Sequence, residues 1–183
     1  GSVYRPLESG AGSDFLSVSE GRSGGGVVRI ATSSFALDGV INANGAGLGT
    51  NSRGGAGGSV WIAASRVSGV GSIDASGGGA YWGGGGGGAV SVEYTDAASI
   101  VPRLAANPGI HTTTTAVTLA GPGSVYVRGP QSTYGSLRID SGTLLSDEAT
   151  QLSSFGKGAA QSGSNGATLM TSKASIPAYF LGH

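Results

Sequence analysis

Apolar and variable residues alternate in a short motif that occurs four times along the chain. The motif reads Gly, any residue, Val, any residue, and then Ile or Val. Its copies begin at Gly26, Gly58, Gly88 and Gly123, so they lie 32, 30 and 35 residues apart. Alternation with a period of two, with β-branched residues at the apolar positions, is typical of a half-buried β-strand. Similarity that recurs at such intervals indicates a repeat architecture.

A second motif follows each copy of the first at a nearly constant distance. Ile41 opens Ile-Asn-Ala-Asn-Gly and Ile73 opens Ile-Asp-Ala-Ser-Gly, each 11 residues after the last apolar residue of the first motif. Leu104 and Ile139 open weaker copies, each 12 residues after that residue. Two motifs that keep their phase over four units predict that every unit supplies two short strands.

These units predict an all-β fold, in the form of a parallel β-solenoid or β-helix-like stack of about four repeats of 30–35 residues. A single unit cannot bury its apolar face, whereas stacked neighbours bury it together. Helices are disfavoured because each Gly in a helix costs about 1 kcal/mol relative to Ala. The pattern leaves the handedness of the coil open.

Stacking would place equivalent residues above one another in columns. We expect three aliphatic columns and one alanine column to face inward, where each large aliphatic side chain contributes roughly 1.5–3 kcal/mol. The inward columns are Val28, Val60, Val90 and Val125; Ile30, Ile62, Val92 and Val127; Ile41, Ile73, Leu104 and Ile139; and Ala43, Ala75 and Ala106. One outward column reads Arg29, Trp61, Ser91 and Tyr126.

Gly-rich segments separate the units, notably residues 45–58 and 77–88. One interpretation is a flexible linker. The other is ordered, polyglycine-II-like chain, which packs closely because no Cβ intervenes. Around this repeat domain, residues 24–142, we expect an N-terminal cap or partial coil at 1–23. Residues 143–183 are expected to form an irregular C-terminal β cap or a subunit contact.

Composition narrows the function classes. Of 183 residues, 37 are Gly and only 11% are charged, against roughly 25% in an ordinary soluble domain. Ten acidic and ten basic residues cancel, so no electrostatic footprint indicates nucleic acid or an anionic membrane. No apolar run is long enough for a membrane span. Cys is absent, which removes thiolate chemistry and disulfides.

The repeat resembles the Gly-rich repeat regions of very large bacterial surface and secreted proteins. The resemblance rests on residues 54–62, 71–78, 83–94 and 121–128, and it covers about residues 20–142. A weaker, compositional likeness is to the Gly-rich tips of phage tail-fibre adhesins. The resemblance implies adhesion or an extracellular fibre and carries over no catalytic residue. Ser91 and Glu93 depart from it, since the family often has an Arg and an aromatic residue there.

Motifs for catalysis and metal binding are weak. Gly21–Gly25 fits the G-x-S-x-G string and Gly83–Gly88 fits G-x-G-x-x-G, but both are expected by chance in so much Gly, and neither precedes a helix. Asp74 and Asp140 with Asn42 form at most an outward polar column, more typical of a solvated face than of a calcium site. We therefore predict no enzyme, no cofactor and no metal; a polysaccharide lyase-like β-helix enzyme is the catalytic alternative, by fold analogy alone.

Binding has stronger candidates. Tyr81 and Trp82 are large aromatic residues in a loop otherwise made of Gly and Ala, where exposed rings would stack on sugars. Buried rings would instead plug an edge or a subunit interface. In the outward column, Arg29 could lie over Trp61, and Tyr126 would extend the aromatic wall. The alternative is that the next Gly-rich loop simply covers Trp61.

We therefore predict a non-catalytic extracellular or cell-surface adhesin or fibre-tip domain that binds a cell-surface glycan or protein receptor. The predicted binding residues are Tyr81, Trp82, Trp61, Tyr126 and Arg29. We also expect self-association or a homo-oligomer, without nucleic-acid binding or membrane insertion. The rival hypothesis is a structural subunit of an extracellular fibre with no small ligand.

Overall fold

A computed structural model describes residues 2–13, 22–47, 53–112, 117–139 and 141, together with 159, 161–165 and 170. The chain divides into two compact units, Gly1–Thr150 and Gln151–His183. In the second unit, the described residues form a short turn in which the N–H of Gln161 donates to the carbonyl of Met170. All sheets described below belong to the first unit.

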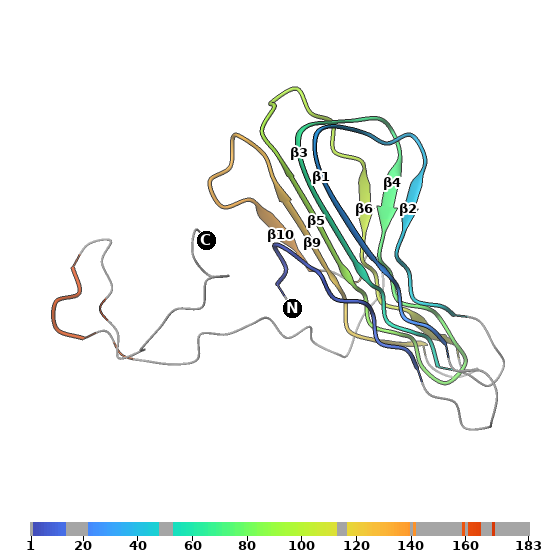
Figure 1. Cartoon of the computed structure of the whole chain (residues 1–183). Helices are drawn as coiled ribbons and strands as arrows, with labels where there is room; N and C mark the ends of the chain where they lie inside the picture. Colours follow the sequence, from blue (N-terminus) through green and yellow to red (C-terminus); the bar gives the residue numbers. More distant parts are fainter. Residues whose placement is uncertain are drawn as a thin grey trace. The chain divides into compact units, whose positions relative to one another are not determined.

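Every regular element in the described part of the chain is a β-strand, as predicted. The strands form a five-stranded sheet, a three-stranded sheet and a two-stranded ribbon (Figure 1). The first sheet has the order β1 (Val27–Ala36), β3 (Ser59–Ser68), β5 (Ala89–Tyr94), β9 (Ser124–Arg128), β10 (Ser136–Arg138). The second has the order β2 (Val40–Asn42), β4 (Ser72–Asp74), β6 (Arg103–Ala105), and β7 (Ile110–Thr112) pairs with β8 (Val117–Leu119).

Parallel pairing confirms the register of the predicted columns. Val60 pairs with Val28 on one side and with Val90 on the other, and Val90 pairs with Val125. Ile73 likewise lies between Ile41 and Leu104 in the second sheet. In the first three units the two motifs therefore occupy the two sheets, and each unit adds one strand to each sheet.

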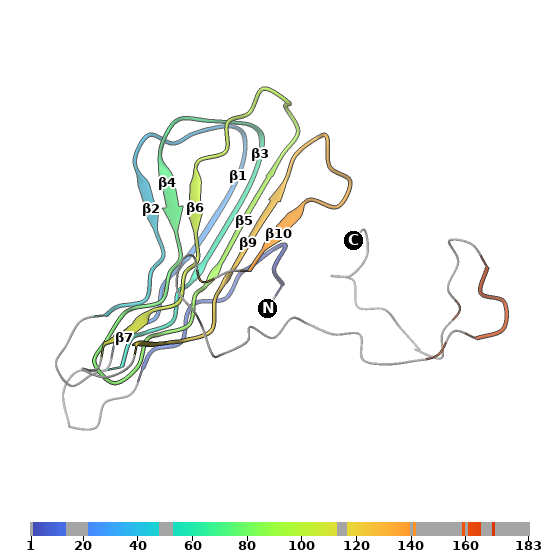
Figure 2. The ribbon, with the colours of Figure 1, turned by 180° about the vertical axis from the view of Figure 1, so that it is seen from behind.

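The core lies between these two sheets, which face each other in Figures 1 and 2. Val60, Ile62, Ile73, Val90 and Val92 are fully buried. The predicted alanine column is also buried, at the point where the two walls approach each other. The first unit is more open, because Val28, Ile30 and Ile41 are only half-buried.

The fourth unit departs from the expected pattern. Ile139 was expected above Leu104, but the chain reverses after β9 and β10 pairs antiparallel with β9. Residues 129–135 make the reversal, with Gly135 at φ 76° and its N–H donating to Ser132 Oγ at 2.9 Å. A positive φ of this kind favours Gly. The second sheet consequently ends at β6, one strand earlier than the four copies of the second motif predicted.

The described parts of the Gly-rich segments are joined to one another by backbone hydrogen bonds, which favours closely packed chains over a flexible linker. The backbone N–H groups of residues 54–58 donate to the carbonyls of three neighbouring segments. Successive residues use different segments, and the same segment is used again every third residue. The donor–acceptor pairs are Gly54–Gly83, Gly55–Ala46, Ala56–Ala11, Gly57–Gly86 and Gly58–Ala43, with N···O distances of 2.8–2.9 Å. We call the segments joined in this way the Gly-rich bundle: residues 10–13, 22–26, 43–47, 53–58, 75–79, 83–88, 106–109 and 120–123.

Close backbone approach explains why the bundle needs Gly. A Cβ placed on Gly25 would lie 1.9 Å from the carbonyl oxygen of Ala43, and one on Gly45 would lie 1.9 Å from that of Gly55. Neither distance is compatible with a side chain. The segments run alongside one another away from the two sheets, and Figure 2 places β7 among them.

Candidate functional site

An exposed aromatic pair lies between segments 75–79 and 83–88 of the Gly-rich bundle. Tyr81 and Trp82 are 37% and 48% exposed, and their rings meet edge to face with centroids 4.9 Å apart and planes at 87°. This arrangement is favourable for aromatic pairs and fixes both rings relative to each other. We call residues 80–83 the aromatic turn.

Backbone hydrogen bonds hold the aromatic turn at both ends. The N–H of Ala80 donates to the carbonyl of Ile110 at 3.0 Å, and Ala80 also forms a parallel bridge with His111. At the other end, the carbonyl of Gly83 accepts from the N–H of Gly54 at 2.8 Å. Two aromatic side chains are thus presented to solvent from a pinned backbone, which lowers the entropic cost of binding a ligand.

Two further side chains flank the turn. Ile110 is 37% exposed, and it lies on β7, whose backbone accepts the hydrogen bond from Ala80. The Cγ of Arg53 lies 4.0 Å from where a Cβ of Gly83 would sit, so the exposed Arg53 side chain runs beside the turn. The surface therefore combines apolar ring area with one cation.

The outward column on the five-stranded sheet has the predicted register but is not open. Arg29 pairs with Trp61, Trp61 with Ser91, and Ser91 with Tyr126. Trp61 is only 8% exposed and Tyr126 only 2%. Neither ring offers a free face to a ligand, so the predicted aromatic wall is a buried layer and its residues do not join the aromatic turn in one site.

The cover is the N-terminal segment, residues 2–13, rather than the Gly-rich loop that the sequence suggested. Tyr4 packs edge to face on Tyr126 with ring centroids 4.8 Å apart. The hydroxyl of Ser91 donates to the carbonyl of Tyr4 at 2.6 Å, and the hydroxyl of Ser59 donates to that of Glu8 at 2.6 Å. The segment therefore crosses β9, β5 and β3 in turn.

Charged groups surround Trp61 under this cover. The guanidinium of Arg29 lies 4.8 Å from the ring centroid, as expected from the column, and that of Arg5 lies 6.0 Å away. The indole Nε1 donates to Glu93 Oε1 at 3.3 Å, and Glu93 Oε2 is paired with Arg128 Nη2. Glu93 thus links the indole to a cation on the next strand.

Burial raises the pKa of Tyr126 above its ordinary value. Desolvation is the largest cause; Arg128 opposes it, and Glu93 and Tyr4 add to it. The Tyr126 hydroxyl donates to the carbonyl of Tyr134 at 2.8 Å, which also favours the protonated phenol. Tyr126 is therefore held as a protonated phenol that packs against the N-terminal segment.

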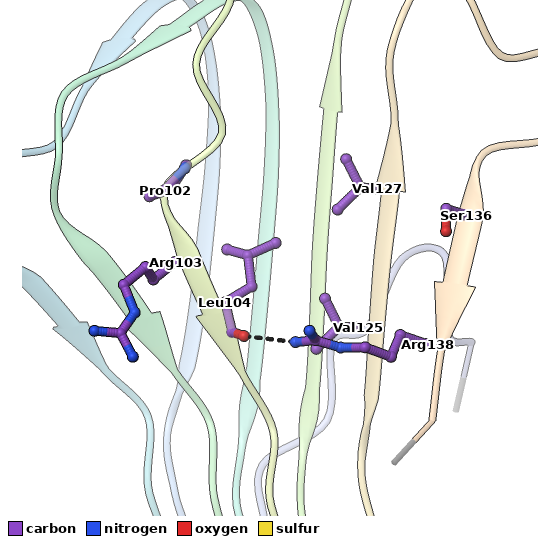
Figure 3. Close-up of a pocket in the computed structure, with 7 residues that line it drawn as sticks. All are labelled: Pro102, Arg103, Leu104, Val125, Val127, Ser136 and Arg138. Atoms are coloured by element: carbon purple, nitrogen blue, oxygen red, sulfur yellow. Dashed lines mark hydrogen bonds between the residues drawn. The ribbon is translucent and has the colours of Figure 1, made fainter. Parts of the chain in front are cut away.

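A groove opens where the second sheet ends (Figure 3), and we call it the end groove. Its volume is about 490 Å³, and Leu104, Val125 and Val127 form its apolar wall. Arg138 crosses it from β10 and donates through Nη2 to the carbonyl of Leu104 at 2.7 Å. This groove occupies the place where Ile139 was expected to continue the core.

Backbone groups of both weak catalytic motifs take part in the Gly-rich bundle. In the G-x-G-x-x-G string, the N–H groups of Gly85, Gly87 and Gly88 donate to Gly78, Gly121 and Ala75, so they are not free to cradle a phosphate. Ser23 and Gly25 of the G-x-S-x-G string are packed in the Gly-rich bundle by backbone contacts.

Metal binding gains no support in the described ranges. These contain no cluster of three or more His, Asp or Glu side chains able to hold a metal ion. Asp74 Oδ1 accepts from the N–H and the hydroxyl of Ser76 instead. Asp140 lies outside the described residues.

Comparison with known proteins adds no relative: no family model, no curated protein and no solved structure matches the chain. Among the described residues, no helix is long and apolar enough to cross a membrane.

Proposed function

We propose that the chain is a non-catalytic adhesin or fibre-tip domain, extracellular or on a cell surface, that binds a glycan with Tyr81 and Trp82. The observation that carries this proposal is the exposed edge-to-face pair on a pinned turn. Sugars present flat apolar faces that stack on such rings, and Arg53 beside the turn adds a donor for sugar oxygens.

The scaffold in this proposal is a parallel β-solenoid that continues into a polyglycine-II-like bundle. Support for the solenoid comes from the one-to-one register of Val28, Val60, Val90 and Val125. Support for the bundle comes from hydrogen-bond partners that repeat every third residue, since polyproline II chains have three residues per turn. Such a scaffold would hold short binding loops at the end remote from the sheets.

Binding to a glycan array tests the proposal. We expect the intact chain to bind a defined subset of glycans and Trp82→Ala to abolish that binding, because the larger exposed ring is lost. Tyr134→Ala is the matched control, since Tyr134 is a 67% exposed aromatic residue far along the chain from the turn. Equal loss in both variants, or binding that survives Trp82→Ala, would contradict the proposal.

A structural fibre subunit is the second candidate, and the free edge of β1 favours it. β1 pairs only with β3 among the described strands, so one side of a ten-residue strand lacks a partner. Val27 and Val40 are 42% and 67% exposed at this end of the two sheets. Unprotected edges of this length invite pairing with another chain.

A further inference from the structure

A second hollow, which we call the polar groove, lies at the carboxyl ends of β5 and β9. Its volume is about 570 Å³, within the roughly 300–1,000 Å³ of small-molecule pockets. It forms because β5 ends at Tyr94, opposite Ala64, while β3 continues to Ser68. Small residues, Ala31 and Ala63 among them, make its floor, and residues 129–133 make one wall.

One charged group in the polar groove retains donors for a ligand. Arg128 is 37% exposed, and its only side-chain hydrogen bond to a described residue goes to Glu93. A guanidinium has five N–H donors, so most of them remain unused. Glu93 is 14% exposed, and its two oxygens already accept from Trp61 and Arg128. No other acidic residue lines the groove.

The remaining lining is suited to a polyhydroxylated ring. Ser65, Tyr94 and Thr133 line the groove, and none of their hydroxyls is hydrogen-bonded within the described part of the chain. Tyr94 adds a half-buried ring, and the alanine side chains of the floor are small and apolar, so they leave room beneath the apolar face of a sugar. Free hydroxyls beside an available guanidinium match a ligand that carries both hydroxyl groups and a negative charge.

We propose that the polar groove binds a saccharide with a carboxylate, such as a uronic acid unit, and that Arg128 receives the carboxylate. Glu93 is a positioning residue, because its ion pair through Nη2 holds the Arg128 guanidinium in place while the other N–H groups of the guanidinium can donate to the carboxylate. This site is separate from the aromatic turn and does not depend on glycan binding there.

Isothermal titration with galacturonic acid trisaccharide, and with galactose trisaccharide as the neutral probe, tests this site on the full chain. Ala31 is exposed and lines the floor of the polar groove, so the larger side chain of Ala31→Phe should fill part of the groove. We therefore expect at least a tenfold loss of affinity for the acidic trisaccharide. Ala36→Phe is the matched control, because Ala36 is exposed on the same strand and does not line the groove. Ala36→Phe should leave the affinity unchanged.

Arg128→Gln tests whether the guanidinium of Arg128 binds the carboxylate of the saccharide. We expect the preference for the acidic over the neutral trisaccharide to fall at least tenfold, whereas Arg103→Gln, on the other sheet, leaves it intact. Lack of saturable binding of the acidic probe up to about 10 mM would overturn the proposal. So would affinity unaffected by Ala31→Phe, or binding lost through Trp82→Ala, which would place the ligand at the aromatic turn instead.

Discussion

At single positions of this protein, the choice of amino acid is limited mainly by how closely other backbone segments approach and by burial. Two adjacent glycines show that this limit can change from one residue to the next. Gly25 lies within the Gly-rich bundle, where a Cβ would collide with the carbonyl of Ala43. At Gly26, one position along, nothing lies within 4 Å of an added Cβ. The requirement for Gly is therefore a property of the position and does not follow from composition.

Ala substitution at these two positions gives a direct test. We expect Gly25→Ala to destabilise the chain by several kcal/mol, because backbone atoms must move apart and hydrogen bonds of the bundle are lost. Gly26→Ala should change the free energy of unfolding by less than about 1 kcal/mol. Urea unfolding measures both, and equal effects would show that the bundle is not closely packed in solution.

Because of Tyr126, we expect the free energy of unfolding to fall at alkaline pH. Its folded pKa is raised above the unfolded value of about 10. Its contribution is fully present below about pH 10 and is lost as the pH rises through that value toward the folded pKa, since the unfolded state releases its proton first. Tyr126→Phe should make the alkaline decline shallower, at a cost of about 1 kcal/mol at neutral pH for the lost hydrogen bond to Tyr134. Denaturant midpoints across pH 8–11 provide the measurement; an unchanged profile in the variant would exclude Tyr126 as the source.

At the scale of elements, the N-terminal segment has the largest effect on the exposed surface. It contributes no strand, yet its contacts with Tyr126, Ser91 and Ser59 cover the outward column. Residues 10–13 are joined to the Gly-rich bundle by backbone hydrogen bonds, whereas Tyr4 and Glu8 meet the five-stranded sheet through contacts that involve side chains. We therefore expect residues 2–8 to be easier to displace than a paired strand.

The chain has only two Trp residues, so fluorescence can follow this cover. In Trp82→Phe, the remaining Trp61 should be poorly quenched by acrylamide, and deletion of residues 2–8 should raise its quenching severalfold. In Trp61→Phe, the exposed Trp82 should be quenched equally with and without that deletion. Quenching of Trp61 that does not respond to the deletion would mean that the segment does not cover it in solution.

At the scale of the whole molecule, the two ends of the stack differ. The β1 end leaves a ten-residue strand edge unpaired among the described strands. At the other end, β10 covers the edge of β9, and Arg138 reaches across to Leu104. Growth by simple head-to-tail stacking is therefore blocked at one end by an antiparallel strand.

Self-association should consequently depend on the β1 edge. If the chain assembles, Val27→Lys should reduce the assembled fraction in sedimentation velocity, because a charge on an exposed edge position opposes pairing. Leu7→Lys, at another exposed apolar residue, is the control. Assembly that resists Val27→Lys would count against the fibre hypothesis in this form.

The amino-acid sequence alone determined the strands of the first motif in four units and of the second motif in three, with their parallel register and, apart from Ile139, the inward columns. Period-two alternation and a constant spacing between motifs are local signals, and stacking of equal units leaves one register that aligns the aliphatic columns. The exposed pair Tyr81–Trp82 stood out for a similar reason, since large rings are conspicuous among Gly and Ala.

Only the tertiary structure decided the cover over Trp61, the reversal at β10 and the order of the Gly-rich segments. The N-terminal segment has no periodic pattern, and its contacts join residues far apart in sequence. At β10, the turn through Gly135 overrode the repeat phase that placed Ile139 above Leu104. The bundle is held by backbone N–H and C=O groups, which are the same in every Gly. The sequence therefore contains no side-chain pattern that predicts which segments pair.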